Sequence, residues 1–378
     1  MAGHRAELGP PTPWRAVEIV LSRVRNLEAT VGLVLDTRIK FALVEATLRL
    51  QHSRPAEALT RIREARALAD QSSTFRKTPV LNQLSYLLTM EGKLEESMAV
   101  AQEAVAHVEA EYGSNHPRTA LSLFRVAEVQ SFLGREPEEQ VTLDRVIGIF
   151  RNATGVRRDF LARALQRRAQ SRRILGRNAE ALADMQEASA LLEETGTSSQ
   201  RGGAHEAIAR IEKNLGRFEE ALAATDRALS LLEGQEMHEL ALRAGTEVLR
   251  AQLLAELGRP DEALVQLQAS VTAVDETHPW SSVGHMGETG EIADAWASLS
   301  RWDDAQRTLG RYLDREGDYD PLSIGRLQLT RARIYIGAGD FAAAMRWANE
   351  GRATLVAADA GPTDIDEADA VLAAAESE

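Results

Sequence analysis

Apolar residues recur every three or four positions along most of this chain, in stretches that come in pairs. One stretch of a pair, such as LARALQRRAQSRRIL, ends just before a glycine, here Gly176. The other, such as EEALAATDRALSLLE after Gly216, follows a short polar turn. This period is typical of amphipathic helices. The pattern therefore predicts repeated units of helix, tight turn and helix, joined by longer connectors.

A short motif marks each predicted turn and recurs eight times. It consists of glycine or serine, a charged residue, a spacer and then, in most copies, acidic and small residues. The copies read SRPAEAL, GKLEESM, GREPEEQ, GRNAEAL, GRFEEAL, GRPDEAL, SRWDDAQ and GDFAAAM, starting at residues 53, 92, 134, 176, 216, 258, 300 and 339. Successive starts differ by 39, 42, 42, 40, 42, 42 and 39 residues. A fixed period of this length indicates a repeat architecture.

Each motif position has a physical reading. Glycine at the turn permits the left-handed backbone that ends one helix. Acidic residues in the next turn interact favourably with the amino end of the following helix. A small residue five positions after the turn allows two helices to approach closely, and Glu139 is the exception. The small residues are Ala58, Ser97, Ala181, Ala221, Ala263, Ala305 and Ala344, with a second set at Ala65, Ala104, Ala188 and Ala228.

Because of these turn and alanine positions, residues 33 to 358 resemble the tetratricopeptide-repeat (TPR) family. The period near 42 residues is longer than the usual 34 and is shared by HEAT and armadillo repeats, which lack this turn motif. It is similar to the long-period repeats of kinesin light chains, in which a His-Pro connector joins units. His116-Pro117 and His278-Pro279 lie in two such connectors, where we expect structural rather than catalytic roles. In bacteria, chains of this subtype stand alone or follow a serine/threonine kinase domain.

The resemblance implies an all-α fold, a right-handed TPR superhelical solenoid of about eight units. We expect a disordered tail over residues 1–13, an N-terminal capping helix over 14–32, the solenoid over 33–360 and a C-terminal capping helix over 361–378. One unit departs from the pattern, because Gly284, Gly287 and Gly290 fall in its first helix. Glycine disfavours helix, so we expect that helix to be shortened and mobile near residues 280–290.

Composition narrows the classes of function. The chain has no cysteine and a net charge of −13. Thiolate chemistry is therefore excluded, and nucleic-acid binding is disfavoured. No apolar run is long enough for a signal peptide or a membrane helix, so we expect a cytoplasmic protein. We found no phosphate loop, metal-ligand spacing or nucleophile–base pair, and predict neither an enzyme nor a cofactor.

The family resemblance also implies where a partner binds. In TPR proteins the first helix of each unit lines a concave groove, with side chains about three, six, nine, ten and thirteen residues before the turn pointing inward. Projected onto this sequence, that register gives the candidate partner-binding residues Asn82, Gln83, Tyr86, Arg125, Arg163, Arg167, Gln170, Arg173, Arg210, Lys213 and Asn214.

Arginines are concentrated in one of these first helices. Residues 157–177 contain eight arginines and a single acid, Asp159. Guanidinium groups bind carboxylates in bidentate fashion, so one interpretation is a cradle for an acidic partner segment. The other is a solvated stripe, or pairing with acids of the neighbouring helix such as Glu180 and Asp184.

The leading hypothesis is a non-enzymatic scaffold that binds a protein or peptide, with an acidic segment, in the groove. The alternatives are a sensory or regulatory module of a larger signalling system, such as a kinase, and an RNA or nucleotide binder.

Overall fold

The computed structural model describes residues 18–19, 21–23, 26, 34–52, 54–153, 158–234, 236–277, 283–314, 317, 319–358 and 360–376. All regular elements in these ranges are α-helices. The predicted tail, most of the predicted N-terminal capping helix, Ser53 and the His278-Pro279 connector lie outside the described residues. The helices form two compact units, residues 1–133 with 144–153, and residues 134–143 with 154–378.

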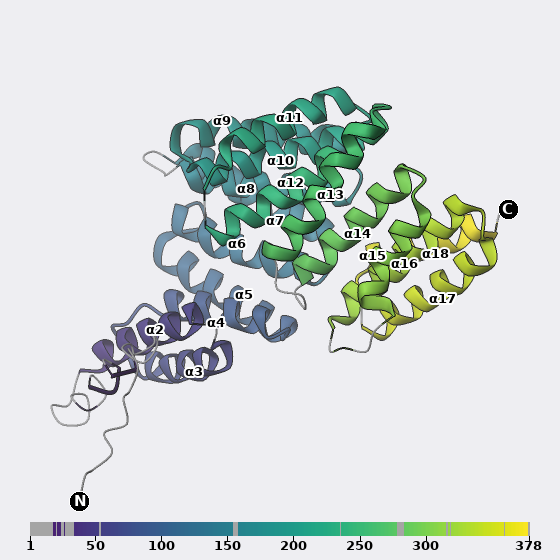
Figure 1. Cartoon of the computed structure of the whole chain (residues 1–378). Coiled ribbons are helices and arrows are strands. Elements are labelled where there is room, and N and C mark those ends of the chain that lie inside the picture. Colours follow the sequence, from purple (N-terminus) through teal and green to yellow (C-terminus); the bar gives the residue numbers. More distant parts are fainter. Residues whose placement is uncertain are drawn as a thin grey trace, which may run out of the picture. The chain divides into compact units, whose positions relative to one another are not determined.

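The first unit contains the helices drawn in purple and blue in Figure 1. Within it, α2 packs on α3, α4 on α5, and α5 on α6. Helix α3 also contacts α4, and α4 contacts α6, so each pair packs on the next. The bounds are α2 Leu35–Gln51, α3 Pro55–Gln71, α4 Thr78–Met90, α5 Leu94–Tyr112 and α6 Pro117–Phe132. Helix α7, Glu136–Asn152, contributes to both units.

The second unit repeats the same arrangement. Each first helix packs on its own second helix, as in α8 with α9 and α16 with α17. First helices also contact first helices of the next pair, as α12 does with α14 and α14 with α16 (Figure 1). The bounds are α8 Arg158–Ile174, α9 Asn178–Thr195, α10 Ser198–Asn214, α11 Phe218–Leu231, α12 Met237–Glu256, α13 Pro260–Thr277, α14 Val283–Ser298, α15 Trp302–Leu313, α16 Pro321–Ala338, α17 Phe341–Ala357 and α18 Pro362–Glu376.

The turn residues have the left-handed backbone that their motif predicts. Gly92, Gly134, Gly176, Gly216, Gly258 and Gly339 have φ between 65° and 80°. Ser300 replaces glycine in one motif and still has a φ of 57°, the single non-glycine residue with positive φ in the described ranges. The motif thus fixes the backbone at this position even where a Cβ makes the conformation unfavourable.

Small residues lie where paired helices cross. All seven predicted small residues five positions after a turn have no exposed surface, from Ala58 to Ala344. Glu139 occupies the same position and is 1% exposed. Its carboxylate accepts a hydrogen bond from Arg167 Nε at 2.7 Å. Burial raises the pKa of Glu139, while Arg167 opposes that rise. A buried ion pair therefore replaces the small-residue contact in this unit.

A second repeated contact joins the two helices of one helix–turn–helix repeat. The residue eight positions before a turn lies on the first helix, and the residue eight positions after it lies on the second. In some units both are apolar, as Leu84 and Val100 are in one core cluster. In others the pair is polar or aromatic. These pairs are Glu45 with Arg61, Arg168 with Asp184, Arg250 with Gln266, and Arg331 with Trp347.

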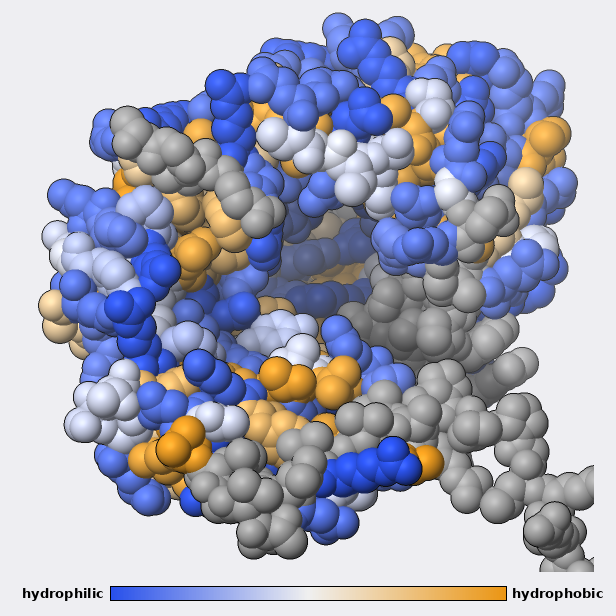
Figure 2. Space-filling view, turned by 90° about the vertical axis from the view of Figure 1, so that its left-hand side faces the viewer, coloured by the Kyte–Doolittle hydropathy of each residue, from blue (hydrophilic) through white to orange (hydrophobic). Residues whose placement is uncertain are grey.

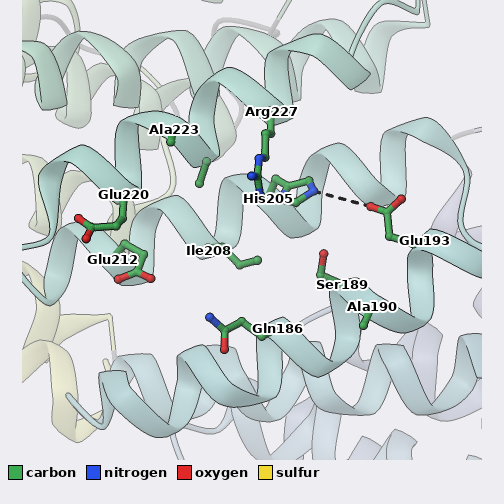
Figure 3. Close-up of a pocket in the computed structure, with 11 residues that line it drawn as sticks. Gln186, Ser189, Ala190, Glu193, His205, Ile208, Glu212, Glu220, Ala223 and Arg227 are labelled. Atoms are coloured by element: carbon green, nitrogen blue, oxygen red, sulfur yellow. Dashed lines mark ion pairs between the residues drawn. The ribbon is translucent and has the colours of Figure 1, made fainter.

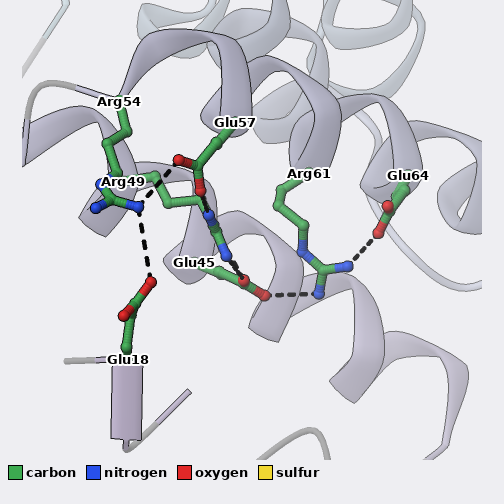
Figure 4. Close-up of polar contacts among 7 residues, drawn as sticks. All are labelled: Glu18, Glu45, Arg49, Arg54, Glu57, Arg61 and Glu64. Carbon is green, nitrogen blue, oxygen red and sulfur yellow. Dashed lines mark hydrogen bonds and ion pairs between the residues drawn. The ribbon is translucent and has the colours of Figure 1, made fainter. Parts of the chain in front are cut away.

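The Glu45–Arg61 pair belongs to an ion-pair network between α2 and α3 (Figure 4). Glu45 is 0% exposed. Arg49 Nη2 lies 2.7 Å from Glu45 Oε1, and Arg61 Nη2 lies 2.7 Å from Oε2. Glu57 and Glu64 bind the outer sides of the two guanidinium groups. One buried carboxylate thus bridges two arginines that reach it from different helices.

The prediction that the first helix of the seventh unit is shortened near its glycines is wrong. Helix α14 runs unbroken from Val283 through Gly287 and Gly290 to Ser298. Gly290 is buried, and a Cβ there would lie 3.4 Å from Leu327 Cδ2, an ordinary van der Waals contact. Gly287 is exposed, and a Cβ there would meet nothing within 4 Å. Contacts with α12 and α16 thus stabilise α14 against its weak helix propensity.

Alanine at exposed Gly287, compared with alanine at buried Gly325 on α16, tests the helical assignment of α14. We expect Gly287→Ala to raise the free energy of unfolding by about 1 kcal/mol, because alanine favours helix and has room there. The matched variant Gly325→Ala should instead lower it by about 1–3 kcal/mol through overpacking, because its Cβ would lie 2.7 Å from Leu355 Cγ. Urea unfolding followed by circular dichroism measures both. A destabilised Gly287→Ala variant would contradict the helical assignment of this segment.

Candidate functional site

Four of the predicted partner-binding residues lie together in the first unit. Asn82 Nδ2 on α4 donates to Ser122 Oγ on α6 at 3.4 Å. Gln83 Nε2 donates to Thr47 Oγ1 on α2 at 2.9 Å. These two side chains therefore link α4 to α6 and to α2.

Tyr86 and Arg125 complete this group. Tyr86 is 38% exposed, and the Arg125 guanidinium carbon lies 5.0 Å from the centre of its ring. Arg125 also forms an ion pair with Glu128 at 2.6 Å. Its charge is therefore largely compensated within the unit, and Tyr86 presents the partly exposed apolar surface.

Several arginines of α8 bind the neighbouring helix α9. Arg168 Nη2 and Arg172 Nη1 lie 2.6 and 2.7 Å from the two carboxylate oxygens of Asp184. Arg177, the N-cap residue of α9, forms a local ion pair with Glu180 in the first turn of that helix at 2.6 Å. The interpretation in which these side chains pair with acids of the next helix is therefore confirmed for Arg168 and Arg172. Arg168 and Arg172 stabilise the helix pair, since a buried carboxylate lies between them.

Polar side chains of α10, α12 and α14 form a continuous surface in the second unit, which we call the first-helix face. Lys213 on α10 donates to Gln252 on α12. Gln252 Nε2 donates to the backbone oxygen of Glu291 on α14 at 2.8 Å. Arg210 on α10 forms ion pairs with Glu206 and, across α12, with Glu291. Burial opposes the charge of Arg210, but these two carboxylates raise its pKa overall.

A cavity of about 290 Å³ opens on this face between α8, α10 and α14. Gln170, Arg173, Glu206, Arg210 and Glu291 line it. Arg173 Nε donates to Gln170 Oε1 at 3.2 Å. Within the described ranges no carboxylate lies within ion-pair distance of Arg173. Burial and then the charge of Arg210 lower the pKa of Arg173, so its guanidinium is a half-buried cation that would be stabilised by an anion.

Three carboxylates, those of Glu206, Glu288 and Glu291, interact electrostatically on the same face. Glu288 on α14 lies over Gly245 of α12, where a Cβ would approach its Oε1 to 2.6 Å. Burial, followed by the charge of Glu291, raises the pKa of Glu288 to about 8. Arg210 opposes this rise, and Glu206 adds to it. Glu288 is therefore largely protonated at neutral pH.

Two predicted residues remain, and four residues near the first-helix face were not predicted. Arg163 and Asn214 are exposed on α8 and α10. Gln252, Glu288, Glu291 and Asp294 were not predicted. The register that selected Arg167 and Gln170, nine and six residues before a turn, selects Glu291 and Asp294 before Ser300.

A further cavity lies elsewhere in the second unit. It measures about 700 Å³ and lies between α9 and α11 above α10 (Figure 3). Its floor includes Ile208, and His205 Nε2 lies 3.8 Å from Glu193 Oε1 at one end, beside Arg227. Burial is the main cause of the lowered pKa of His205. Glu220 lies at the other end, and none of the predicted partner-binding residues lines this cavity.

Other classes of site find little support. In the described part of the chain no three His, Asp or Glu side chains are arranged to bind a metal ion. Among the described helices none is both long and apolar enough to cross a bilayer. On the face drawn in Figure 2, hydrophilic residues predominate and apolar residues form small separate groups. His116 caps α6, since its Nδ1 accepts from the backbone nitrogen of Arg118 at 3.1 Å, a structural role.

Comparison with solved structures shows the TPR fold. A tetratricopeptide repeat protein from Parabacteroides merdae ATCC 43184 aligns with a TM-score of 0.55 and 14% identity, over 80% of this chain and 100% of that one. The apo form of RapI gives a TM-score of 0.66 and 12% identity over 91% and 94% of the two chains. The apo form of the quorum sensor NprR from B. thuringiensis gives 0.61 and 12% over 90% and 94%. No protein-family model matches the sequence, and no curated protein does.

Proposed function

We propose that this chain is a non-enzymatic TPR scaffold that binds an acidic segment of a partner protein on the first-helix face. The observation that carries the proposal is Arg173, a half-buried guanidinium at the 290 Å³ cavity with no carboxylate partner in the described ranges. Gln170 beside it supplies a side-chain amide that can bind a peptide backbone. A carboxylate entering the cavity would gain a charge-assisted hydrogen bond.

Fewer arginines are available to a partner than the eight arginines of residues 157–177 suggested. Arg167, Arg168, Arg172 and Arg177 bind acids of the same chain, so they add little attraction for a partner. Glu291 limits the site on its other side, because it already binds Arg210. Specificity would then come from one acidic side chain of the partner, placed between Arg173, which attracts it, and Glu291, which repels misplaced acids.

The test reverses one charge. We expect Arg173→Glu to weaken binding of a fluorescein-labelled peptide rich in Glu and Asp by about tenfold or more, because an attraction becomes a repulsion in a half-buried site. Arg173→Lys should retain part of the affinity. Fluorescence anisotropy at several salt concentrations measures the dissociation constants.

Arg259→Glu is the matched control, because Arg259 is exposed and pairs with Glu262 on α13. A second control peptide carries Gln and Asn in place of every acid. Equal loss of binding in Arg173→Glu and Arg259→Glu would reveal nonspecific electrostatics. Equal binding of the acidic and amide peptides would also reject the proposal.

A sensory or regulatory role is the alternative that we retain. NprR, whose fold this chain shares, is a quorum sensor. A sensory chain would bind a small effector rather than a protein segment, and binding of the acidic peptide would argue against it.

A further inference from the structure

A third cavity lies between α15 and α17 above α16, in the part of the chain that follows α14. It measures about 640 Å³, within the usual range for small-molecule sites. Its lining combines arginines with two aromatic side chains. The residues are Asp303, Gln306, Arg307, Asp314, Arg331, Tyr335, Arg346 and Trp347.

Buried donors without acceptors distinguish this cavity. The side chain of Arg331 is 5% exposed. Its Nη1 and Nη2 atoms bind Asp314, with Nη1 at 2.7 Å, but its Nε is buried without a hydrogen-bond partner. Trp347 Nε1 is likewise buried and unpartnered. Buried N–H groups that lack acceptors are rare and costly in folded proteins.

Cations surround the indole of Trp347. The guanidinium carbons of Arg331 and Arg346 lie 4.6 and 5.5 Å from the centre of its ring. Arg346 is exposed and has no ion pair in the described ranges, so its guanidinium can turn from the ring towards the cavity. Arg307 lines the opposite side on α15 and forms an ion pair with Asp304. Three arginines thus face two acids, Asp303 and Asp314, in the lining.

We propose that this cavity binds a small organic molecule carrying an oxyanion, a phosphate or a carboxylate group. Arg307 and Arg346 bind the anion from the two sides, since guanidinium groups recognise both kinds of oxyanion. Trp347 Nε1 and Arg331 Nε gain the acceptor that they lack. Tyr335 and the indole supply aromatic surface for the body of the ligand, which the cavity is large enough to accept.

The indole N–H of Trp347 reports on the site directly. The chain has five tryptophans, so a ¹⁵N-labelled, deuterated sample of the full chain gives few indole signals, and Trp347→Phe identifies the relevant one. We expect phenyl phosphate or benzoate to shift that signal saturably at millimolar concentration, at constant ionic strength. The stronger of these two ligands identifies the anion as phosphate or carboxylate. Benzyl alcohol, which lacks the charge, should leave the signal in place.

Two variants make the test specific to the cavity. Arg346→Gln should reduce the affinity for the anion about tenfold, because it removes one charge-assisted contact. Arg352→Gln is the matched control on the same helix, since Arg352 is bound to Asp369. Both side chains are exposed, so neither change should unfold the chain. An unmoved Trp347 signal with both anions, or an equal response in the two variants, would overturn the proposal.

Discussion

A Glu288→Gln variant is expected to be more stable than the parent chain above about pH 8, by up to about 5 kcal/mol. The pKa of Glu288 rises from 4.5 to about 8, and each pKa unit corresponds to about 1.4 kcal/mol. Between these values the folded chain binds more protons than the unfolded chain, so stability falls as pH rises. Glutamine mimics the protonated carboxyl and removes this loss.

The measurement is a set of urea unfolding curves at about pH 5, 7 and 9 for both chains. The two should be similar near pH 5 and should separate between about pH 5 and 8, where Glu288 is protonated in the folded chain and ionised in the unfolded chain. Glu262→Gln is the control, because Glu262 is exposed on α13 and its pKa is lowered by Arg259. A Glu288→Gln variant that is less stable than the parent at all three pH values would show that the carboxylate is needed charged.

Replacing Glu45 with alanine is expected to lower the free energy of unfolding by about 3–5 kcal/mol, the usual cost of removing one member of a buried ion pair. Glu45 is fully buried between Arg49 and Arg61 (Figure 4). Without it, two guanidinium groups face each other across the α2–α3 contact. Glu57 and Glu64 remain on their outer sides, which places the expected cost at the lower end of that range.

Glu64→Ala is the matched control for Glu45→Ala. Glu64 belongs to the same network and also binds Arg61, but half of its side chain is exposed. Exposed ion pairs contribute about 0–1 kcal/mol, so its removal should have little effect. Hydrogen exchange should locate the loss in Glu45→Ala to α2 and α3, because each repeat contacts mainly its neighbours. Equal destabilisation by the two variants would show that burial does not set the cost.

The sequence by itself determined the repeat and its local conformations. A turn motif every 39 to 42 residues was enough to predict paired helices, left-handed backbone at Gly176 and Gly258, and burial of Ala181 and Ala263. These features depend on residues within one motif, or on one small side chain at a fixed helix crossing. Both features recur at fixed positions of the motif, so they follow from local sterics at the turn and from the contact between two neighbouring helices.

Only the tertiary structure decided which charged side chains remain available. Arg168 and Arg173 lie five residues apart on α8 and look alike in the sequence, yet Arg168 binds Asp184 while Arg173 reaches a cavity without a carboxylate partner in the described ranges. Likewise, Arg210 meets Glu291, 81 residues further along the chain. Packing of successive helix pairs sets these distances, and helix propensity did not foresee that α14 continues through its glycines. The pairing of charges is therefore a property of the stacked helices, because an ion pair depends on separation in space.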